Sequence, residues 1–163
     1  MKIGLLSDTH GHLDKGIMEF LKPCAEVWHA GDIGPLELGL DPITAIHNTR
    51  SVYGNIDNNI ARAHLPEIRR WEIQGIRFLM THIGGRPPRY AKGIRELLKK
   101  EKPHVFICGH SHILLIKKDP SLNLMFMNPG AAGKYGIHTV RTLVRFDIIA
   151  GKMTNMEILE LPK

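Results

Sequence analysis

Five short apolar runs in this chain each lead into a polar loop with side chains that can bind a metal ion. The runs cover residues 3–6, 27–30, 51–53, 76–80 and 105–108, a length typical of buried β-strands. The polar residues that follow them are, in chain order, Asp8, His10, Asp32, Asn55, His82, His110 and His112. In α/β sheets, ligand-binding groups gather beyond the carboxyl ends of the strands. We therefore expect segments that are distant in sequence to converge on one site.

Helical patterns separate several of these runs. Residues 13–21 repeat apolar side chains at helical spacing, and Asp41-Pro42 is typical of an N-cap followed by the first helical residue. We expect Pro87-Pro88 to open a further helix. Its apolar face would consist of Tyr90, Ile94, Leu97 and Leu98.

The remaining apolar runs predict more strands. Gly75 lies between residues 71–74 and 76–80, which favours a hairpin, and residues 128–130 favour a turn with a backbone role. Further strands are expected at residues 114–116, 124–127, 140–146 and 156–159. No repeat, low-complexity segment or linker divides the sequence, so we expect one α/β domain over residues 1–163.

The composition excludes several classes of protein. Two cysteines, Cys24 and Cys108, are too few for a disulfide scaffold or a paired-cysteine zinc motif. The chain has no apolar run of about 18 residues, and the apolar stretch at its start is too short for a signal peptide. We therefore expect a cytoplasmic protein without a membrane partner.

The net charge of +6 favours anionic partners such as phosphate esters. Much of the excess lies in residues 86–102, where the solvated face of a helix is the simplest explanation. Nucleic acid is disfavoured as a partner, because aromatic residues make up only 6% of the chain and no RNA-binding or helix-turn-helix motif is present.

The polar motifs occur in a fixed order along the chain. They are Asp8-Thr9-His10, Gly31-Asp32, Gly54-Asn55-Ile56-Asp57, Thr81-His82 and Gly109-His110-Ser111-His112. This series resembles the calcineurin-like metallophosphoesterases, and the short chain and Gly-Asn-x-Asp form are similar to the small YfcE-type phosphodiesterase branch. The resemblance covers about residues 1–130. It implies a four-layer α/β/β/α sandwich, in which two mixed sheets are flanked by helices.

The resemblance also implies a site with two metal ions. Asp8, His10 and His112 would hold one ion, Asn55, His82 and His110 would hold the other, and Asp32 would bridge the two. The implied activity is hydrolysis of a small phosphodiester by a metal-activated hydroxide. Phosphomonoesters are a second substrate class that the sequence leaves open. A homo-oligomer is expected by resemblance only.

The donor types themselves favour particular metals. Four imidazoles and two carboxylates without a thiolate suit Mn, Fe, Ni, Co or Zn better than Mg or Ca, which prefer oxygen ligands. We expect two divalent transition-metal ions, with Mn first. Such a pair activates water and neutralises phosphoryl oxygens without a covalent enzyme intermediate.

One position departs from the family pattern. Many members carry histidine directly after the Gly-Asn pair, where it can assist the leaving group, but this chain has Ile56. His12 is the first candidate for a replacement proton donor, and His138 is a weaker one. We expect Asp57 to orient a metal-bound histidine, with a turn-forming role as its alternative. The expected catalytic residues are therefore Asp32, Asn55, Asp57 and His12.

The remaining polar candidates have simpler explanations. His29 lies inside an apolar run and is expected to be a core histidine. Structural or surface roles are expected for His47, His64 and His104. Arg86 and Arg89 follow flexible glycines, so they either contact phosphate or belong to a surface loop.

A binding scaffold with the same fold is the main alternative to an enzyme. Retromer has a metallophosphoesterase-like subunit that resembles this family and has lost key ligands. All the ligand positions are filled in this chain, which favours the enzyme, whereas Ile56 keeps the alternative open.

Overall fold

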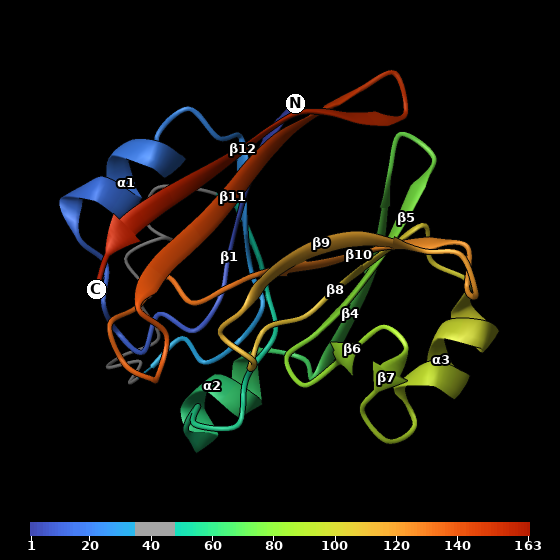
Figure 1. Cartoon of the computed structure of the whole chain (residues 1–163), viewed down its shortest axis with the longest axis horizontal. Coiled ribbons are helices and arrows are strands. Elements are labelled where there is room, and N and C mark those ends of the chain that lie inside the picture. The colour runs from blue at the N-terminus through green and yellow to red at the C-terminus, as the bar shows by residue number, and fades with distance from the viewer. Residues whose placement is uncertain (35–47) are drawn as a thin grey trace.

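The computed structural model describes residues 1–34 and 48–163, and two five-stranded β-sheets form its centre (Figure 1). The strand order of the first sheet is β12-β11-β1-β2-β3. Its strands are β1 (Lys2–Leu6), β2 (Glu26–His29), β3 (Asn48–Ser51), β11 (Val140–Ile149) and β12 (Lys152–Pro162). The second sheet has the order β4-β5-β8-β10-β9. Its strands are β4 (Ile68–Ile73), β5 (Ile76–Thr81), β8 (Val105–Ile107), β9 (Leu114–Asp119) and β10 (Leu124–Pro129).

Both sheets are mixed, because each contains three neighbouring parallel strands together with antiparallel ones. β1, β2 and β3 are parallel neighbours, as are β5, β8 and β10, while the remaining pairs are antiparallel. The parallel arrangement brings the carboxyl ends of β1, β2 and β3 to one edge of the first sheet. The ends of β5 and β8 lie together in the second sheet in the same way.

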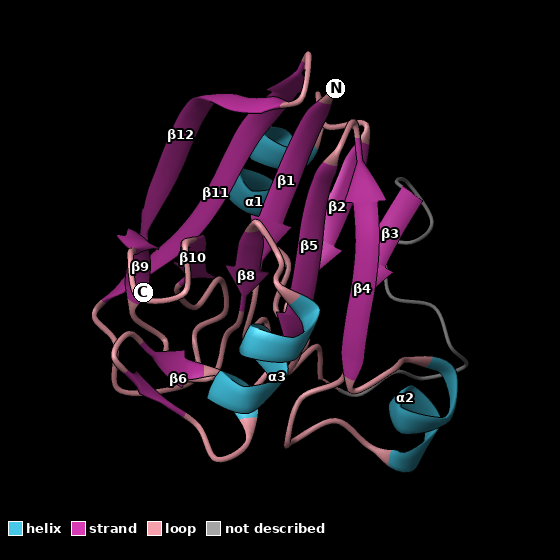
Figure 2. Ribbon diagram, turned by 90° about the vertical axis from the view of Figure 1, so that its right-hand side faces the viewer, coloured by secondary structure: helices cyan, strands magenta, loops and turns pink. Residues whose placement is uncertain are grey.

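Apolar side chains fill the space between the sheets and cover both outer faces. In the centre, the fully buried indole of Trp28 packs against Trp71, Phe78 and Phe146, with ring centroids 4.8–5.6 Å apart. The helix α1 (Lys15–Leu21) packs on the outside of the first sheet through Ile17 and Leu21. The helix α3 (Ile94–Glu101) covers the second sheet through Leu98 (Figure 2). These layers confirm the expected α/β/β/α sandwich.

The prediction of a helix that opens at Pro87-Pro88 is wrong. Both prolines lie in the turn of a small hairpin between β6 (Gly85–Arg86) and β7 (Arg89–Tyr90), and α3 begins only at Ile94. Proline disfavours helical backbone in the residue before it, so adjacent prolines favour an extended turn. Tyr90 nevertheless packs with the apolar cluster beneath α3.

Three smaller predictions, on the third strand, the helix at Asp41-Pro42 and membrane spans, can also be compared with the structure. The third strand runs over Asn48–Ser51 and ends before Tyr53, and the short helix α2 (Asn59–His64) was not expected. The helix expected at Asp41-Pro42, like His47, lies outside the described residues. In the described part of the chain, no helix has the length and apolar character needed to cross a membrane.

The start of α1 makes folding sensitive to acid. Asp14 is the N-cap, and its carboxylate accepts hydrogen bonds from the Ile17 amide at 3.1 Å and pairs with Arg141 at 2.8 Å. Burial alone would raise the pKa of Asp14, but the Ile17 amide, Arg141 and His12 lower it to about 2. A carboxyl group with a lowered pKa in the folded state stabilises the fold above its unfolded pKa of about 3.8.

We expect Asp14→Asn, which retains a capping oxygen, to remove this acid-sensitive contribution. After discounting for solvent screening, the free energy of unfolding should fall by about 1–2 kcal/mol at neutral pH. The difference from the unsubstituted protein should shrink as the pH falls from about 4 to 2, because the carboxyl group then protonates in both states. Urea denaturation at a series of pH values measures it. A difference that stays constant over this range would contradict the assignment.

Candidate metal centre

The loops that follow the parallel strands of the two sheets meet at one place. The Asp8 amide donates a hydrogen bond to the Gly31 carbonyl, which links the loops after β1 and β2. The Gly109 amide donates to the His82 carbonyl, which links the loops after β5 and β8. The His110 amide donates to Oδ2 of Asp8 at 3.1 Å and joins the two sheets.

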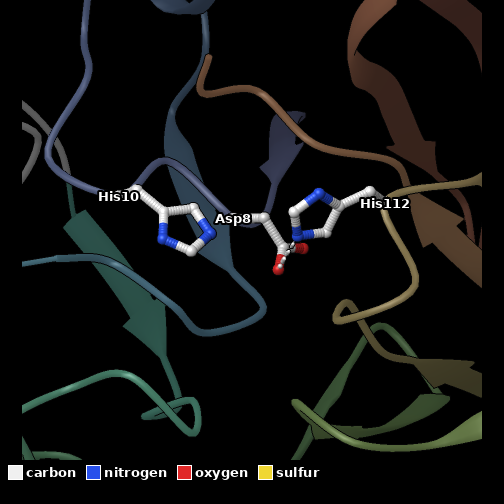
Figure 3. Close-up of side chains that lie close together, drawn as sticks. All are labelled: Asp8, His10 and His112. Atoms are coloured by element: carbon white, nitrogen blue, oxygen red, sulfur yellow. Dashed lines mark ion pairs between the residues drawn. The ribbon is translucent and has the colours of Figure 1, made fainter. Parts of the chain in front are cut away.

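Two clusters of metal-ligating side chains form there, and they share Asp8. Asp8, His10 and His112 form the first cluster (Figure 3), and Asp8, Asp32 and His82 form the second. Within each cluster, the possible ligand atoms lie within 4.8 Å of one another.

The carboxylate oxygens lie between the histidines of both clusters. Nε2 of His112 is 3.2 Å from Oδ1 of Asp8. The two oxygens of Asp32 face different histidines, with Oδ1 3.3 Å from Nε2 of His82 and Oδ2 3.9 Å from Nε2 of His10. Asp32 is therefore placed between the clusters, as the expected bridging ligand would be.

The other expected ligands, Asn55 and His110, lie beside the second cluster. Oδ1 of Asn55 is 3.1 Å from Nε2 of His82, and the His110 ring packs edge-on against the His82 ring at a centroid distance of 5.3 Å. The structure thus brings together all the residues that the sequence suggested as metal ligands.

The donor atoms of this site suit a bound cation. Among the described residues, buried Oδ1 of Asp8 and buried Nε2 of His10 form no hydrogen bond. A buried polar atom without a partner has a substantial free-energy cost, which a metal ion would remove. Imidazole nitrogen and carboxylate oxygen together fit a divalent transition metal.

Hydrogen bonds on the far side of two histidines fix which nitrogen faces the site. Nδ1 of His82 donates to the Ala30 carbonyl at 2.7 Å, so in the neutral ring Nε2 carries the lone pair. Nε2 of His138 donates to the Gly133 carbonyl, so its Nδ1 accepts from Nδ1 of His112 at 3.1 Å. Nε2 of His112 is then also unprotonated toward Asp8, as a metal ligand must be.

Asp57 was expected to orient a metal-bound histidine, but His82 and His112 have other hydrogen-bond partners. Asp57 accepts hydrogen bonds from the amides of Gly34 and Gly54, at 2.9 and 2.7 Å, and within the described residues it bonds to no histidine. Each oxygen of Asp57 thus bonds to a loop amide, and this carboxylate holds the two loops together. His138, which we expected only as a weak proton donor, orients His112 instead.

The expected proton donor His12 lies on the α1 side of its loop. Its Nε2 is 3.2 Å from Oδ2 of Asp14, the helix cap.

Burial lowers the pKa of His138, and the neighbouring His112 lowers it further, so His138 favours its neutral form.

Electrostatic coupling is strong inside the site. The carboxylates of Asp32 and Asp8 raise the pKa of His82 above its usual range, although burial opposes this. Burial opposes ionisation of Asp32 as well, but hydrogen bonds from His82 and the Ile56 amide lower its pKa. The carboxylates therefore attract positive charge to Nε2 of His82, either a proton or a metal ion in its place.

Most of the candidate ligands have an unusual backbone conformation. Asp8, His10, Asp32, His110 and His112 all have positive φ angles, between 49° and 67°. Such left-handed backbone costs about 1–2 kcal/mol per residue for side chains with a Cβ atom. Strain of this kind persists where the surrounding structure imposes it, and it is concentrated at functional sites.

Two glycines allow the ligand loops to approach closely. A Cβ atom on Gly54 would lie 2.0 Å from Oδ1 of Asp32, and one on Gly109 would lie 1.9 Å from Oγ of Ser7 and 2.9 Å from Oδ2 of Asp8. All three distances are shorter than van der Waals contact. The glycines of the Gly-Asn and Gly-His motifs are therefore required for the ligand geometry.

The other residues considered in the sequence fall into three groups. His29 is buried and bonded to Thr9 and Gly31, as expected of a core histidine. His64 and His104 are exposed and bond to nearby backbone groups. The turn residue Asn128 is buried, and its amide donates to the Gly109 carbonyl and to Ser111, which supports the backbone role expected for that turn.

Sequence reasoning missed one residue beside the site. The ring of Tyr135 lies 5.2 Å from the His10 ring, and its side chain is largely exposed. It belongs to the glycine-rich segment before His138, where no motif or apolar spacing marks it.

These features define a class of protein, namely an α/β/β/α sandwich with a candidate histidine–aspartate metal centre at its strand ends. The family model of the calcineurin-like phosphoesterase superfamily domain matches residues 1–151, and the chain belongs to this superfamily. This confirms the resemblance found in the sequence. A comparison with curated proteins finds no match.

Several solved structures share the fold. A novel archaeal phosphodiesterase is 22% identical, with a TM-score of 0.73 over 98% of this chain and 100% of that one. A predicted phosphoesterase from Streptococcus pneumoniae is 19% identical, with a TM-score of 0.71 over 99% and 97%. Zinc-complexed Vps29 from Entamoeba histolytica is 15% identical, with a TM-score of 0.71 over 99% of both chains.

We expect Gly54→Ala to weaken metal binding, because the added methyl group displaces Asp32. The affinity for Mn²⁺, measured by calorimetry, should fall about 10–100-fold. The matched control is Gly75→Ala in the β4–β5 turn, where a Cβ atom would meet nothing within 4 Å. The control has its own backbone strain, with φ at +81°, but should bind Mn²⁺ normally. Equal affinities in the two variants would contradict the geometric argument.

Proposed function

We propose that this protein is a phosphodiesterase that uses two divalent transition-metal ions, with Mn²⁺ as the first candidate. The observation that carries the proposal is the pair of ligand clusters that share Asp8, in which buried Oδ1 of Asp8 and Nε2 of His10 form no hydrogen bond within the described residues. Membership of the phosphoesterase superfamily supports the reaction class.

The proposed ligands divide between the two clusters. Asp8, His10 and His112 would hold one ion, Asn55, His82 and His110 the other, and Asp32 would contact both. When bound, the ions would supply a water of lowered pKa and positive charge for the phosphoryl oxygens. The Ala30 carbonyl and His138 keep His82 and His112 in the tautomer that can ligate.

The two buried cysteines fit the expected cytoplasmic location. Burial raises the pKa of both thiols, that of Cys24 to about 11 and that of Cys108 to about 12. Unreactive, reduced thiols are typical of a reducing compartment.

Hydrolysis of bis(p-nitrophenyl) phosphate tests the proposed activity. We expect no turnover after metals are stripped, recovery with Mn²⁺, and a loss of about 100-fold or more in kcat/KM for Asp32→Ala. The control is Asp147→Ala, which removes a carboxylate that pairs with Lys2 near the start of β1. Metal-independent turnover, or equal turnover in Asp32→Ala, would exclude this mechanism.

The position of Ile56 predicts a preference for good leaving groups. Its side chain is 46% exposed and cannot donate a proton, while its amide donates to Oδ1 of Asp32 at 3.0 Å. We expect Ile56→His to raise kcat/KM about 100-fold for diesters with poor leaving groups, and far less for p-nitrophenyl esters. The matched control is Ile60→His in α2, since Ile60 is equally exposed. A series of aryl esters measures the effect, and an unchanged dependence on leaving-group pKa would contradict a missing acid.

A binding scaffold is the second candidate function. Vps29 has the same fold, and the long outer strand β12 of this chain exposes Met156 and Ile158. If metal ions bind but no phosphodiester is hydrolysed, the scaffold becomes the better explanation.

A further inference from the structure

A cavity of about 350 Å³ is lined by the candidate ligand His110 and by residues of the β6–β7 hairpin. Its volume lies at the lower end of the range of roughly 300–1,000 Å³ for small-molecule sites. Because Gly109 and His110 line the cavity, a group attached to a phosphate at the candidate metal centre can extend into it.

The walls of the cavity combine apolar and cationic side chains. Ile113, Leu115 and Phe126 line one part, and Arg86 and Arg89 of the hairpin line another. Ile113 is 58% exposed, although it directly follows the candidate ligand His112. An apolar ring would cover this surface and exclude water from it.

Among the residues that the structure describes, the two arginines have no counter-charge. Within the described part of the chain, neither the Arg86 nor the Arg89 guanidinium forms an ion pair or a hydrogen bond, and both residues are exposed. Most arginines of the second sheet are engaged, as in the pair between Arg70 and Glu101. Guanidinium groups bind phosphate through paired N–H donors, so two of them beside a cavity favour an anion.

The hairpin that carries the arginines is anchored at its base. The Tyr90 hydroxyl donates to the carboxylate of Asp119 at 2.6 Å, and the Ala91 amide donates to the Gly84 carbonyl at 3.0 Å. A fixed hairpin reduces the entropy that a ligand would lose in ordering it.

From these observations we propose that the cavity is the subsite for one ester group of the substrate, and that this group is a nucleoside with a second phosphate. The apolar wall takes the base and sugar, and Arg86 and Arg89 bind the second phosphate. The inference rests on the proposed phosphodiesterase function, because the first phosphate must lie at the metal centre.

Binding measurements test the subsite without turnover. The probes are thymidine bisphosphate, with a phosphate on each sugar hydroxyl, and thymidine monophosphate, with one on the primary hydroxyl only. We expect the Mn²⁺-loaded protein to bind the bisphosphate about 10-fold more tightly in calorimetry. In Arg86→Gln/Arg89→Gln the two affinities should become nearly equal.

A matched double variant controls for overall charge. Arg70→Gln/Arg95→Gln removes the same two charges from β4 and α3, outside the cavity, and should retain the preference. Equal affinities for the two probes in the unsubstituted protein, or a preference that survives in Arg86→Gln/Arg89→Gln, would overturn the subsite.

Kinetics then separate the subsite from the proposed activity. The substrates are the p-nitrophenyl esters of thymidine monophosphate, with and without the second phosphate. Faster hydrolysis of the bisphosphate ester, lost in Arg86→Gln/Arg89→Gln, is the expected result. If the bisphosphate probe binds preferentially but neither ester is hydrolysed, the subsite stands and the phosphodiesterase proposal fails. If both esters are hydrolysed at the same kcat/KM, the phosphodiesterase stands and the subsite fails.

Discussion

The carboxylate of Asp8 is the group on which the arrangement of the site depends. It lies just beyond β1 with no exposed surface, and it belongs to both ligand clusters. Oδ2 accepts the amide of His110 from the second sheet, while the Asp8 amide donates to Gly31 in the first. One residue thus joins the loops of the two sheets and holds Oδ1 toward the histidines. A change in the distance between the sheets would therefore change both clusters together.

The rest of the fold holds this strained arrangement in place. Five candidate ligands have left-handed backbone, which a flexible loop would relax by rotating its peptides. The loops are prevented from doing so because backbone bonds tie each to a neighbour, such as that between the amide of His10 and the carbonyl of Asp32. The strands before them are anchored by the buried aromatic cluster around Trp28. Packing between the sheets is thus the source of the free energy that maintains the ligand geometry.

The order of strands and polar motifs was sufficient to predict the candidate ligands, because parallel strands place their carboxyl ends at one edge. The orientation of the histidines was beyond sequence reasoning. The partner of His82 is the carbonyl oxygen of Ala30, a group that every residue has. The partner of His112 is His138, which lies in a loop without apolar periodicity. Asp57 follows Asn55 as a motif residue would, yet its oxygens bond to glycine amides. The residue type alone could not distinguish these cases.

In three loops of the site, an exposed isoleucine directly follows a candidate metal ligand. Ile56, Ile83 and Ile113 directly follow Asn55, His82 and His112, and their side chains are 46%, 44% and 58% exposed. The candidate ligands must keep their geometry to hold a metal ion, whereas the isoleucines that follow them have no such constraint. Under the proposed function, Ile113 with Arg86 and Arg89 in the adjoining cavity would select the organic part of a diester, while the metal centre would determine the reaction.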